Sequence, residues 1–283
     1  MSNIKEIKRK ISSINSVIKT TEAMKMISIS KLNKYKKNLF HVTNYLNHIQ
    51  SILIETMNVV DINNFFFYNT KKNNKKLFIF FTSDKGLCGS FNISIFNKIH
   101  DIIKKKKNNM KLFFFSIGKK GNNYIINNKL NIWNNNFSFK NDLKNFTIKL
   151  TKDFYNKKIT SVYLIFNSFE KNYYKKILVK KLIPITPITY VNKSIKLTPI
   201  LEPCKKNFLE YFIPFYIETK LKKSFFESLS SEHTLRMILM HKATENAYNM
   251  KNNLTLNYNK ERQTVITKEI LEIIGGLESL KNR

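Results

Sequence analysis

Glycine and proline are absent from both ends of this 283-residue chain and are concentrated in its middle. Neither residue occurs in residues 1–85 or 215–274, whereas all five prolines and every glycine except the Gly275–Gly276 pair fall within 86–214. Because these two residue types most often end or bend helices, the distribution predicts two long helical ends around a middle of mixed structure.

Both ends carry a stripe of apolar residues at helical spacing. The N-terminal stripe is regular at first and then continues less strictly through Met24, Ile27 and Leu32. Stripes of this length must be buried on an equally long partner, and the only comparable segment is the other end of the chain. We therefore expect residues 1–57 and 208–283 to pair as one coiled coil; a compact bundle is the alternative, which the lack of turn residues disfavours. The regular positions are Ile4, Ile7, Ile11, Ile14 and Ile18 at the first end, and Ile266, Ile270, Ile273, Leu277 and Leu280 at the second.

The middle of the chain alternates strand-like apolar runs with segments of helical spacing. The runs predict strands over 77–82, 112–117 and 161–166 and an edge strand over 177–183, while the spacing predicts helices over 91–103 and 143–154. This alternation predicts a small Rossmann-like α/β domain over residues 75–200, with a mostly parallel sheet.

Lysine dominates the charge of the chain. Lys and Arg total 50 against 19 Asp and Glu, which gives a formal net charge of +31. Nucleic acid, anionic lipid or an acidic protein would suit this charge, but Asn, Ile and Phe are also over-used, as expected of a drift toward AT-rich codons. Arginine, which reads nucleic acids through bidentate contacts, occurs at only four positions. Selected basicity and compositional drift both remain open.

Membrane insertion is not expected. No apolar run approaches the roughly 18–20 residues that would span a bilayer, and the N-terminus lacks the pattern of a secretory signal. Any association with a membrane would therefore come through a partner. The two cysteines, Cys88 and Cys204, lie too far apart in sequence to suggest a disulfide framework, so a reducing compartment is expected.

The sequence offers no catalytic constellation. The loop at residues 86–90 lies where phosphate loops occur, but it lacks the Lys-Ser/Thr of a Walker A motif and the third glycine of a dinucleotide motif. A tight turn from strand to helix is the favoured interpretation. Cys88 has no nearby histidine in sequence to act as a base, and the five histidines show no metal-ligand spacing. We expect no catalytic residue, metal or cofactor.

Polar residues gather on the last helical segment, just before its apolar stripe. Arg262, Gln263, Thr267 and Glu269 fall within about two helical turns. Residue types alone do not distinguish a contact surface from a solvated helix face.

Three blocks of sequence resemble the signatures of the gamma subunit of F-type ATP synthases. The first opens with Lys5-Glu6-Ile7 and Ile11 and continues from Thr21 to Leu32. The second runs from Thr82 to Gly89 and is followed by Asn92, and the third runs from Ser231 to Ile270. They occur in the order and at the separations typical of that family. Within the second block the motif residues are Asp84, Gly86, Cys88 and Gly89.

The resemblance implies a rotor. The end helices would form an antiparallel coiled coil inside a ring of three alpha and three beta subunits, with the α/β domain at the foot beside the epsilon subunit and the membrane c-ring. Rotation would take the catalytic sites of the beta subunits through different affinities, so that ATP is released. The chain itself would catalyse no reaction. The resemblance further implies no nucleic-acid partner, no homo-oligomer, and a peripheral location on the cytoplasmic face of a bacterial inner membrane.

The resemblance also implies roles for individual residues. Arg262, Gln263 and Thr267 would form hydrogen-bonded catches on one beta subunit at a time, and Met24 would lie near Arg236 beside an acidic loop of beta. Glu202 is the only residue of the c-ring contact that carries over. The alpha- and beta-subunit contact set is thus Met24, Arg236, Arg262, Gln263, Thr267 and Glu269.

The chain departs from the family pattern at two informative positions. Pro214 falls where the family continues its helix, which predicts a break or kink. Tyr248 stands where a small residue is usual, which argues against close helix packing there. Two other classes were weighed: a basic coiled-coil protein that binds nucleic acid, and a small nucleotide-binding enzyme built on the loop at Gly86.

Overall fold

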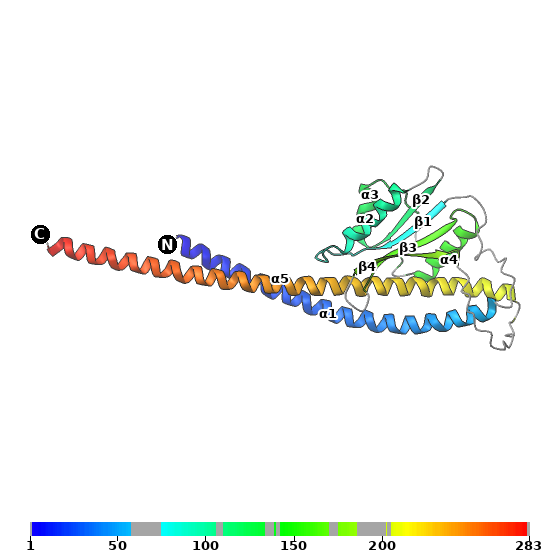
Figure 1. Cartoon of the computed structure of the whole chain (residues 1–283), viewed down its shortest axis with the longest axis horizontal. Coiled ribbons are helices and arrows are strands. Elements are labelled where there is room, and N and C mark those ends of the chain that lie inside the picture. The colour runs from blue at the N-terminus through cyan, green and yellow to red at the C-terminus, as the bar shows by residue number, and fades with distance from the viewer. Residues whose placement is uncertain are drawn as a thin grey trace. The chain divides into compact units, whose positions relative to one another are not determined.

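The computed structural model describes residues 2–57, 75–105, 110–133, 139, 142–169, 175–185, 202 and 205–281. Two long helices lie at the ends of the chain, α1 (Ser2–Met57) and α5 (Lys205–Lys281) (Figure 1). The elements between them are β1 (Lys75–Phe81), α2 (Phe91–Lys104), β2 (Lys111–Ile117), α3 (Lys119–Asn127), α4 (Leu143–Tyr155), β3 (Ser161–Phe169) and β4 (Lys175–Ile183).

The four strands form one sheet in the order β2-β1-β3-β4. Strand β1 pairs in parallel with both β2 and β3, whereas the edge strand β4 runs antiparallel to β3. Residues Leu77–Phe81 are buried on both faces of the sheet, which explains their unbroken apolar sequence. The predicted mostly parallel sheet with an edge strand is confirmed.

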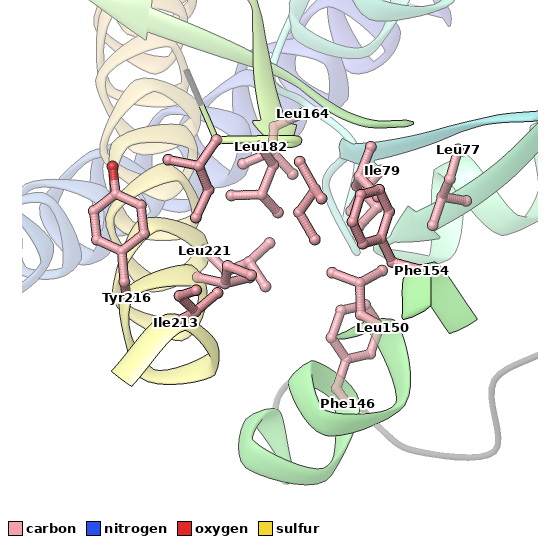
Figure 2. Packing of buried hydrophobic residues seen from close by; sticks show 14 of the residues in the cluster. Leu77, Ile79, Phe146, Leu150, Phe154, Leu164, Leu182, Ile213, Tyr216 and Leu221 are labelled. Carbon is pink, nitrogen blue, oxygen red and sulfur yellow. The ribbon is translucent and has the colours of Figure 1, made fainter. Parts of the chain in front are cut away.

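Helices cover both faces of the sheet. On one face, side chains of α4 and α5 pack against Leu77, Ile79, Leu164 and Leu182, as Figure 2 shows. On the other face, Phe91, Ile95 and Ile99 of α2 and Ile125 of α3 pack against Phe78, Phe80 and Phe114. The larger core includes Phe146, Leu150 and Phe154 from α4, and Ile213, Tyr216 and Leu221 from α5.

The chain forms two compact units, which divide both end helices. Unit 1 contains residues 1–29 and 236–283, and unit 2 contains residues 30–235. In unit 2, Tyr35 stacks on His233 and Tyr45 packs edge-on against Phe215, so α1 and α5 run antiparallel there. Of the α/β domain expected over 75–200, residues 186–200 lie outside the described part of the chain.

The helix pair of unit 1 is also antiparallel, because Thr21 bonds to Thr244 while Glu22 bonds to Tyr248 and Lys25 to His241. Buried and half-buried positions repeat at intervals of three and four residues on both helices. We call these positions the seam. The seam consists of Ile4, Ile7, Ile11, Ile14, Ile18, Thr21, Lys25 and Ser28 on α1, and of Met240, Thr244, Ala247, Lys251, Leu254, Tyr258, Glu261 and Val265 on α5.

The seam corrects the expected course of the N-terminal stripe. The stripe was expected to continue through Met24 and Ile27, but Ile27 is 56% exposed and Ser28 is buried. The strict spacing of three and four persists instead, and it carries polar side chains at Thr21, Lys25 and Ser28. The expectation is therefore wrong at Ile27, whereas Met24 is half-buried and Leu32 is buried as expected.

The sequence does not predict helix α3, because Gly118 and Gly121 follow the apolar run of β2 closely and glycine disfavours a helix. Gly121 is in fact buried inside this helix, where an added Cβ would lie 2.6 Å from Thr82 Oγ1 and 2.9 Å from Phe80 Cε2. The absence of a side chain at Gly121 lets α3 pack closely against the sheet. Because glycine weakens helices, the sequence pattern did not predict this helix.

Helix α5 continues through Pro214, so the predicted break is wrong, and the alternative of a kink stays a prediction. Proline removes one helical hydrogen bond and clashes with the preceding turn, which costs about 3 kcal/mol. Its neighbours Ile213 and Ile217 are fully buried, and each such side chain contributes about 1.5–3 kcal/mol on burial. The packing of this segment therefore outweighs the local cost.

Replacing Pro214 with alanine should raise the free energy of unfolding by about 1–3 kcal/mol, because it restores the backbone N–H and relieves the clash. Thermal unfolding followed by circular dichroism would measure the change. Tyr211→Ala, in the preceding turn and 84% exposed, serves as a control that should change little. A loss of stability in Pro214→Ala would contradict this account of the helix.

Candidate functional site

The polar residues near the C-terminus form a solvent-facing surface on α5. Arg262, Gln263, Thr267 and Glu269 are all exposed in unit 1. The Thr267 hydroxyl donates to the backbone carbonyl oxygen of Gln263 at 2.9 Å. This bond does not use the Gln263 side chain, so its amide group can still bind another molecule. Neither Arg262 nor Glu269 has a side-chain partner among the described residues. The surface thus offers a guanidinium, an amide and a carboxylate to another molecule.

An apolar helix face follows this polar surface directly. The expected stripe at Ile266, Ile270, Ile273 and Leu277 is present, but these side chains are 43% to 63% exposed. They lie beyond Val265, where the α5 side of the seam ends, so α1 does not cover them. Exposed apolar side chains on one helix face are typical of a surface that another molecule covers. Leu280, the last expected position, has a side chain outside the described residues.

Met24 and Arg236 lie in the same unit and are both half-buried. The bonds from Thr21 to Thr244 and from Lys25 to His241 place Met24 level with His241–Thr244 on α5. Arg236 lies more than one helical turn from that level. Met24 and Arg236 therefore lie near the same part of the helix pair, but they do not face each other directly.

The central motif folds as a hydrogen-bonded turn between β1 and α2. Asn92 Oδ1 accepts from the Ser83 backbone N–H at 3.0 Å, and Asn92 Nδ2 donates to Ser83 Oγ at 2.8 Å. Buried Cys88 places its Sγ 3.5 Å from both Ser83 Oγ and Asn92 Nδ2. Gly89 adopts a φ of 57°, in the region that favours glycine. The interpretation as a tight turn accounts for these residues.

The same turn lies at the end of the sheet where α/β folds usually bind a ligand. This part of the sheet is formed by the carboxyl ends of β1 and β3, where the chain reverses its direction of strand addition. Asn167, fully buried at the end of β3, donates to the Phe91 carbonyl oxygen at 2.9 Å. Asn92 and Asn167 are thus both engaged in hydrogen bonds within the chain.

The remaining motif residues connect the turn to its neighbours. Asp84 Oδ1 accepts from the Lys119 backbone N–H at 3.1 Å, so the motif holds the start of α3. An added Cβ at Gly86 would meet nothing within 4 Å, so packing does not require glycine there. Both residues are exposed. Glu202 is likewise exposed, but its flanking residues 186–201 and 203–204 lie outside the described part of the chain.

Sequence reasoning missed a set of polar contacts that bridge the two helices of unit 1. Tyr248 is expected to disturb close packing, yet its ring is 43% exposed beside the seam and its hydroxyl bonds to Glu22 Oε1 at 2.9 Å. This hydrogen bond raises the pKa of Tyr248 above its ordinary value. The available signal was the seam spacing itself, which places Thr21, rather than an apolar residue, after Ile18.

Over the described ranges, no group of three or more His, Cys, Asp or Glu side chains is arranged to hold a metal ion. Over the same ranges, every helix is too short or too polar to cross a membrane.

Comparisons with known proteins agree along the full chain. A family model described as ATP synthase matches residues 3–280. The ATP synthase gamma chain of Flavobacterium johnsoniae is 33% identical over 286 residues, which cover 99% of this chain and 99% of the relative. The ATP synthase gamma chain of Geotalea uraniireducens is 32% identical over 287 residues, with 99% and 100% coverage.

Solved structures share the fold. A chain of the Euglena gracilis mitochondrial ATP synthase, in an OSCP/F1/c-ring structure, aligns with a TM-score of 0.64 at 16% identity and covers 99% of this chain and 95% of its own length. A chain of the Tetrahymena thermophila mitochondrial ATP synthase, from a central stalk and c-ring structure, aligns with a TM-score of 0.55 at 21% identity, with 79% and 99% coverage. The family model and the curated relatives place this chain in the ATP synthase gamma chain family.

Proposed function

We propose that the chain is the central-stalk rotor subunit of an F-type ATP synthase, which couples rotation of a membrane c-ring to ATP synthesis on the beta subunits. The full-length match to ATP synthase gamma chains carries this proposal. The fold shared with chains of solved ATP synthases supports it. As a gamma chain, the protein is a non-catalytic subunit of the enzyme complex and is peripheral to the membrane.

The nucleic-acid-binding alternative is not favoured. Its support was the net charge of +31, which a gamma chain with drifted composition also accommodates. Only four arginines are available for base contacts, and the relatives that match the whole chain are ATP synthase subunits.

The proposed partners follow from the family. The alpha and beta subunits would surround the C-terminal part of α5, while the epsilon subunit and the c-ring would contact the α/β domain and Glu202. In a bacterium, this assembly would place the chain on the cytoplasmic face of the inner membrane. The exposed apolar face beyond Val265 suits an apolar sleeve, because burying it removes hydrophobic surface from water.

A rotor must also present unequal contacts to the three beta subunits, since three equal contacts would favour no orientation. Directional hydrogen bonds supply such a preference. Arg262 and Gln263 are exposed just before the apolar face, and charge-assisted hydrogen bonds contribute about 1.5–3 kcal/mol each. We assign these two residues and Thr267 the role of catches, with Glu269 on the same surface.

The combined change Arg262→Ala and Gln263→Ala tests the catches. We expect ATP synthesis driven by a proton gradient to fall at least about tenfold, because the lost hydrogen bonds exceed the 1.4 kcal/mol that corresponds to one factor of ten. Assembly, measured by co-purification with the ring subunits, should persist because the apolar face is unchanged.

Thr264→Ala is the matched control. Its hydroxyl bonds only to the Lys260 carbonyl oxygen of its own helix, and it is exposed next to Gln263. Synthesis by this variant should equal that of the unaltered complex. Normal synthesis by the double variant would count against the catch roles, and failure of the unaltered chain to co-purify with a hexameric ATPase would count against the rotor assignment.

A further inference from the structure

The seam of unit 1 changes character where α1 passes from Ile18 to Ser28. The seam positions before this stretch are all isoleucine, whereas the next three are Thr21, Lys25 and Ser28. Each polar position falls at the same spacing as the isoleucines, so the change is chemical and not geometric. On the α1 side, the isoleucines alone do not distinguish alignments that differ by seven residues, because the same residue type recurs at that interval.

A hydroxyl pair lies inside this polar stretch. Thr244 is 6% exposed, and its Oγ1 lies 2.9 Å from Thr21 Oγ1. Each hydroxyl is also within bonding distance of a carbonyl oxygen of its own helix, that of Ile18 for Thr21 and that of Met240 for Thr244. Because a hydroxyl has one proton, one threonine donates across the seam while the other donates to its own helix.

Two further contacts bridge the helices beside this pair. The Tyr248 hydroxyl lies 2.9 Å from Glu22 Oε1. Lys25 Nζ lies 3.3 Å from His241 Nδ1, and His241 Nε2 lies 3.4 Å from Glu245 Oε1. Lys25 Nζ can donate to His241 Nδ1, and His241 Nε2 can donate to Glu245 Oε1. All of these groups lie within about two helical turns.

We propose that the contacts Thr21–Thr244 and Glu22–Tyr248 set the register of the helix pair in unit 1. A buried polar pair in a helix seam selects one alignment, because other alignments place its members against apolar side chains. Shifting the helices by seven residues in one direction places Thr244 opposite Ile14 and Thr21 opposite Met237, and both cross-helix bonds are lost. Shifting them the other way places Thr244 opposite Ser28, where one bond can form again.

Register matters because it fixes where α1 begins along α5. In the observed register, Ile4 lies level with Glu261, next to the exposed surface that starts at Arg262. A shift of seven residues moves that boundary by about 10 Å, and it either covers part of the polar surface or uncovers more of the seam. Glu22 and Tyr248 thus act as positioning residues for a surface that they do not touch.

Cysteine reporters read the register directly. Counting from the Thr21–Thr244 contact places Ile11 opposite Leu254, so Ile11→Cys with Leu254→Cys reports the observed alignment. Pairing Ile11→Cys with Ala247→Cys reports the first shifted alignment, and pairing it with Glu261→Cys reports the second. Disulfides formed in the full chain within its assembled complex would be identified by peptide mapping.

Removing the contacts should redistribute the disulfides. In the chain carrying Thr21→Val, Thr244→Val and Tyr248→Phe, we expect the Ala247 reporter to rise relative to the Leu254 reporter by about two- to tenfold for each bond lost. The disulfide reported by Ile11→Cys with Glu261→Cys should increase less. The alignment that it reports would be stabilised by a Thr244–Ser28 bond, and Thr244→Val removes that bond as well. The control Thr255→Val with Thr264→Val deletes hydroxyls that bond only to their own helix, and it should leave the ratios unchanged.

The outcomes separate this inference from the rotor assignment. Unchanged reporter ratios in the triple variant, or an equal rise in the control, would overturn the register role. Tyr248→Phe alone provides a variant that should fold, because its ring is partly exposed, and it should give part of the redistribution. The disulfides report contacts within one chain, so they remain informative even where the catch residues prove unimportant for coupling.

Discussion

Replacing Gly118 with alanine should lower the free energy of unfolding of unit 2 by about 3–5 kcal/mol. The residue has a φ of +124°, which side chains rarely adopt, and an added Cβ would lie 2.2 Å from the Thr82 carbonyl oxygen. Backbone strain of this kind costs about 1–3 kcal/mol, and forcing an atom into a packed site costs a similar amount. Urea unfolding followed by far-ultraviolet circular dichroism would measure the loss.

Two other glycines provide matched controls. Gly86 and Gly275 each have nothing within 4 Å of an added Cβ. Gly275 lies inside α5, so Gly275→Ala should strengthen the helix by about 0.5–1 kcal/mol. Gly86→Ala should change stability little. If Gly118→Ala proved as stable as these two variants, the close approach of the β2–α3 turn to β1 would be wrong.

Truncating Phe146 to alanine should cost about 3–5 kcal/mol, the range found for fully buried aromatic side chains. Phe146 projects from α4 into the core and is fully buried. Its ring centroid lies 5.2 Å from that of Phe115, 5.5 Å from that of Trp133 and 5.3 Å from that of Phe139. The truncation removes all three ring contacts and leaves a cavity among aromatic side chains that relax only partially, so little of the loss should be recovered.

Phe146→Leu and Phe40→Ala serve as controls for the Phe146→Ala measurement. Leucine retains most of the volume, so Phe146→Leu should cost less than half as much as Phe146→Ala. Phe40 is 63% exposed on α1, and its truncation should stay within about 0.5 kcal/mol. The same thermal or urea unfolding measurement applies to all three. Equal losses at Phe40 and Phe146 would show that the aromatic cluster does not hold α4 on the sheet.

The sequence predicted those parts of the fold in which one pattern dominates. The apolar run from Leu77 predicted a buried strand, and the spacing along Phe91, Ile95 and Ile99 predicted the helix whose face it forms. The long end helices followed from the absence of breakers. In each case the local preference and the tertiary packing favour the same structure.

The errors arose where tertiary contacts override local preference. Pro214 and Gly121 are unfavourable inside helices, but the buried neighbours of Pro214 and the close approach of Gly121 to Thr82 stabilise α5 and α3 around them. The sequence pattern did not identify Thr21 as a seam position, because threonine interrupts an apolar stripe. Its place becomes clear only from its contact with Thr244, more than 200 residues later in the chain.

The candidate site was predictable only by resemblance. Arg262, Gln263, Thr267 and Glu269 show no pattern beyond polarity, and their exposure on α5 is compatible with any solvated helix. Burial provides the missing information, because it shows that α1 stops covering α5 at Val265 and that apolar side chains continue beyond it.

The end of α5 beyond Val265 has a consequence for biogenesis. This segment is little longer than the ~12–15 residues at which an unsupported helix becomes marginal in water, and it contains the Gly275–Gly276 pair. Its exposed isoleucines and leucines would attract one another in newly made, unassembled chains. Cells would therefore gain from supplying ring subunits in step with this chain, because an excess of the chain alone would aggregate or be degraded.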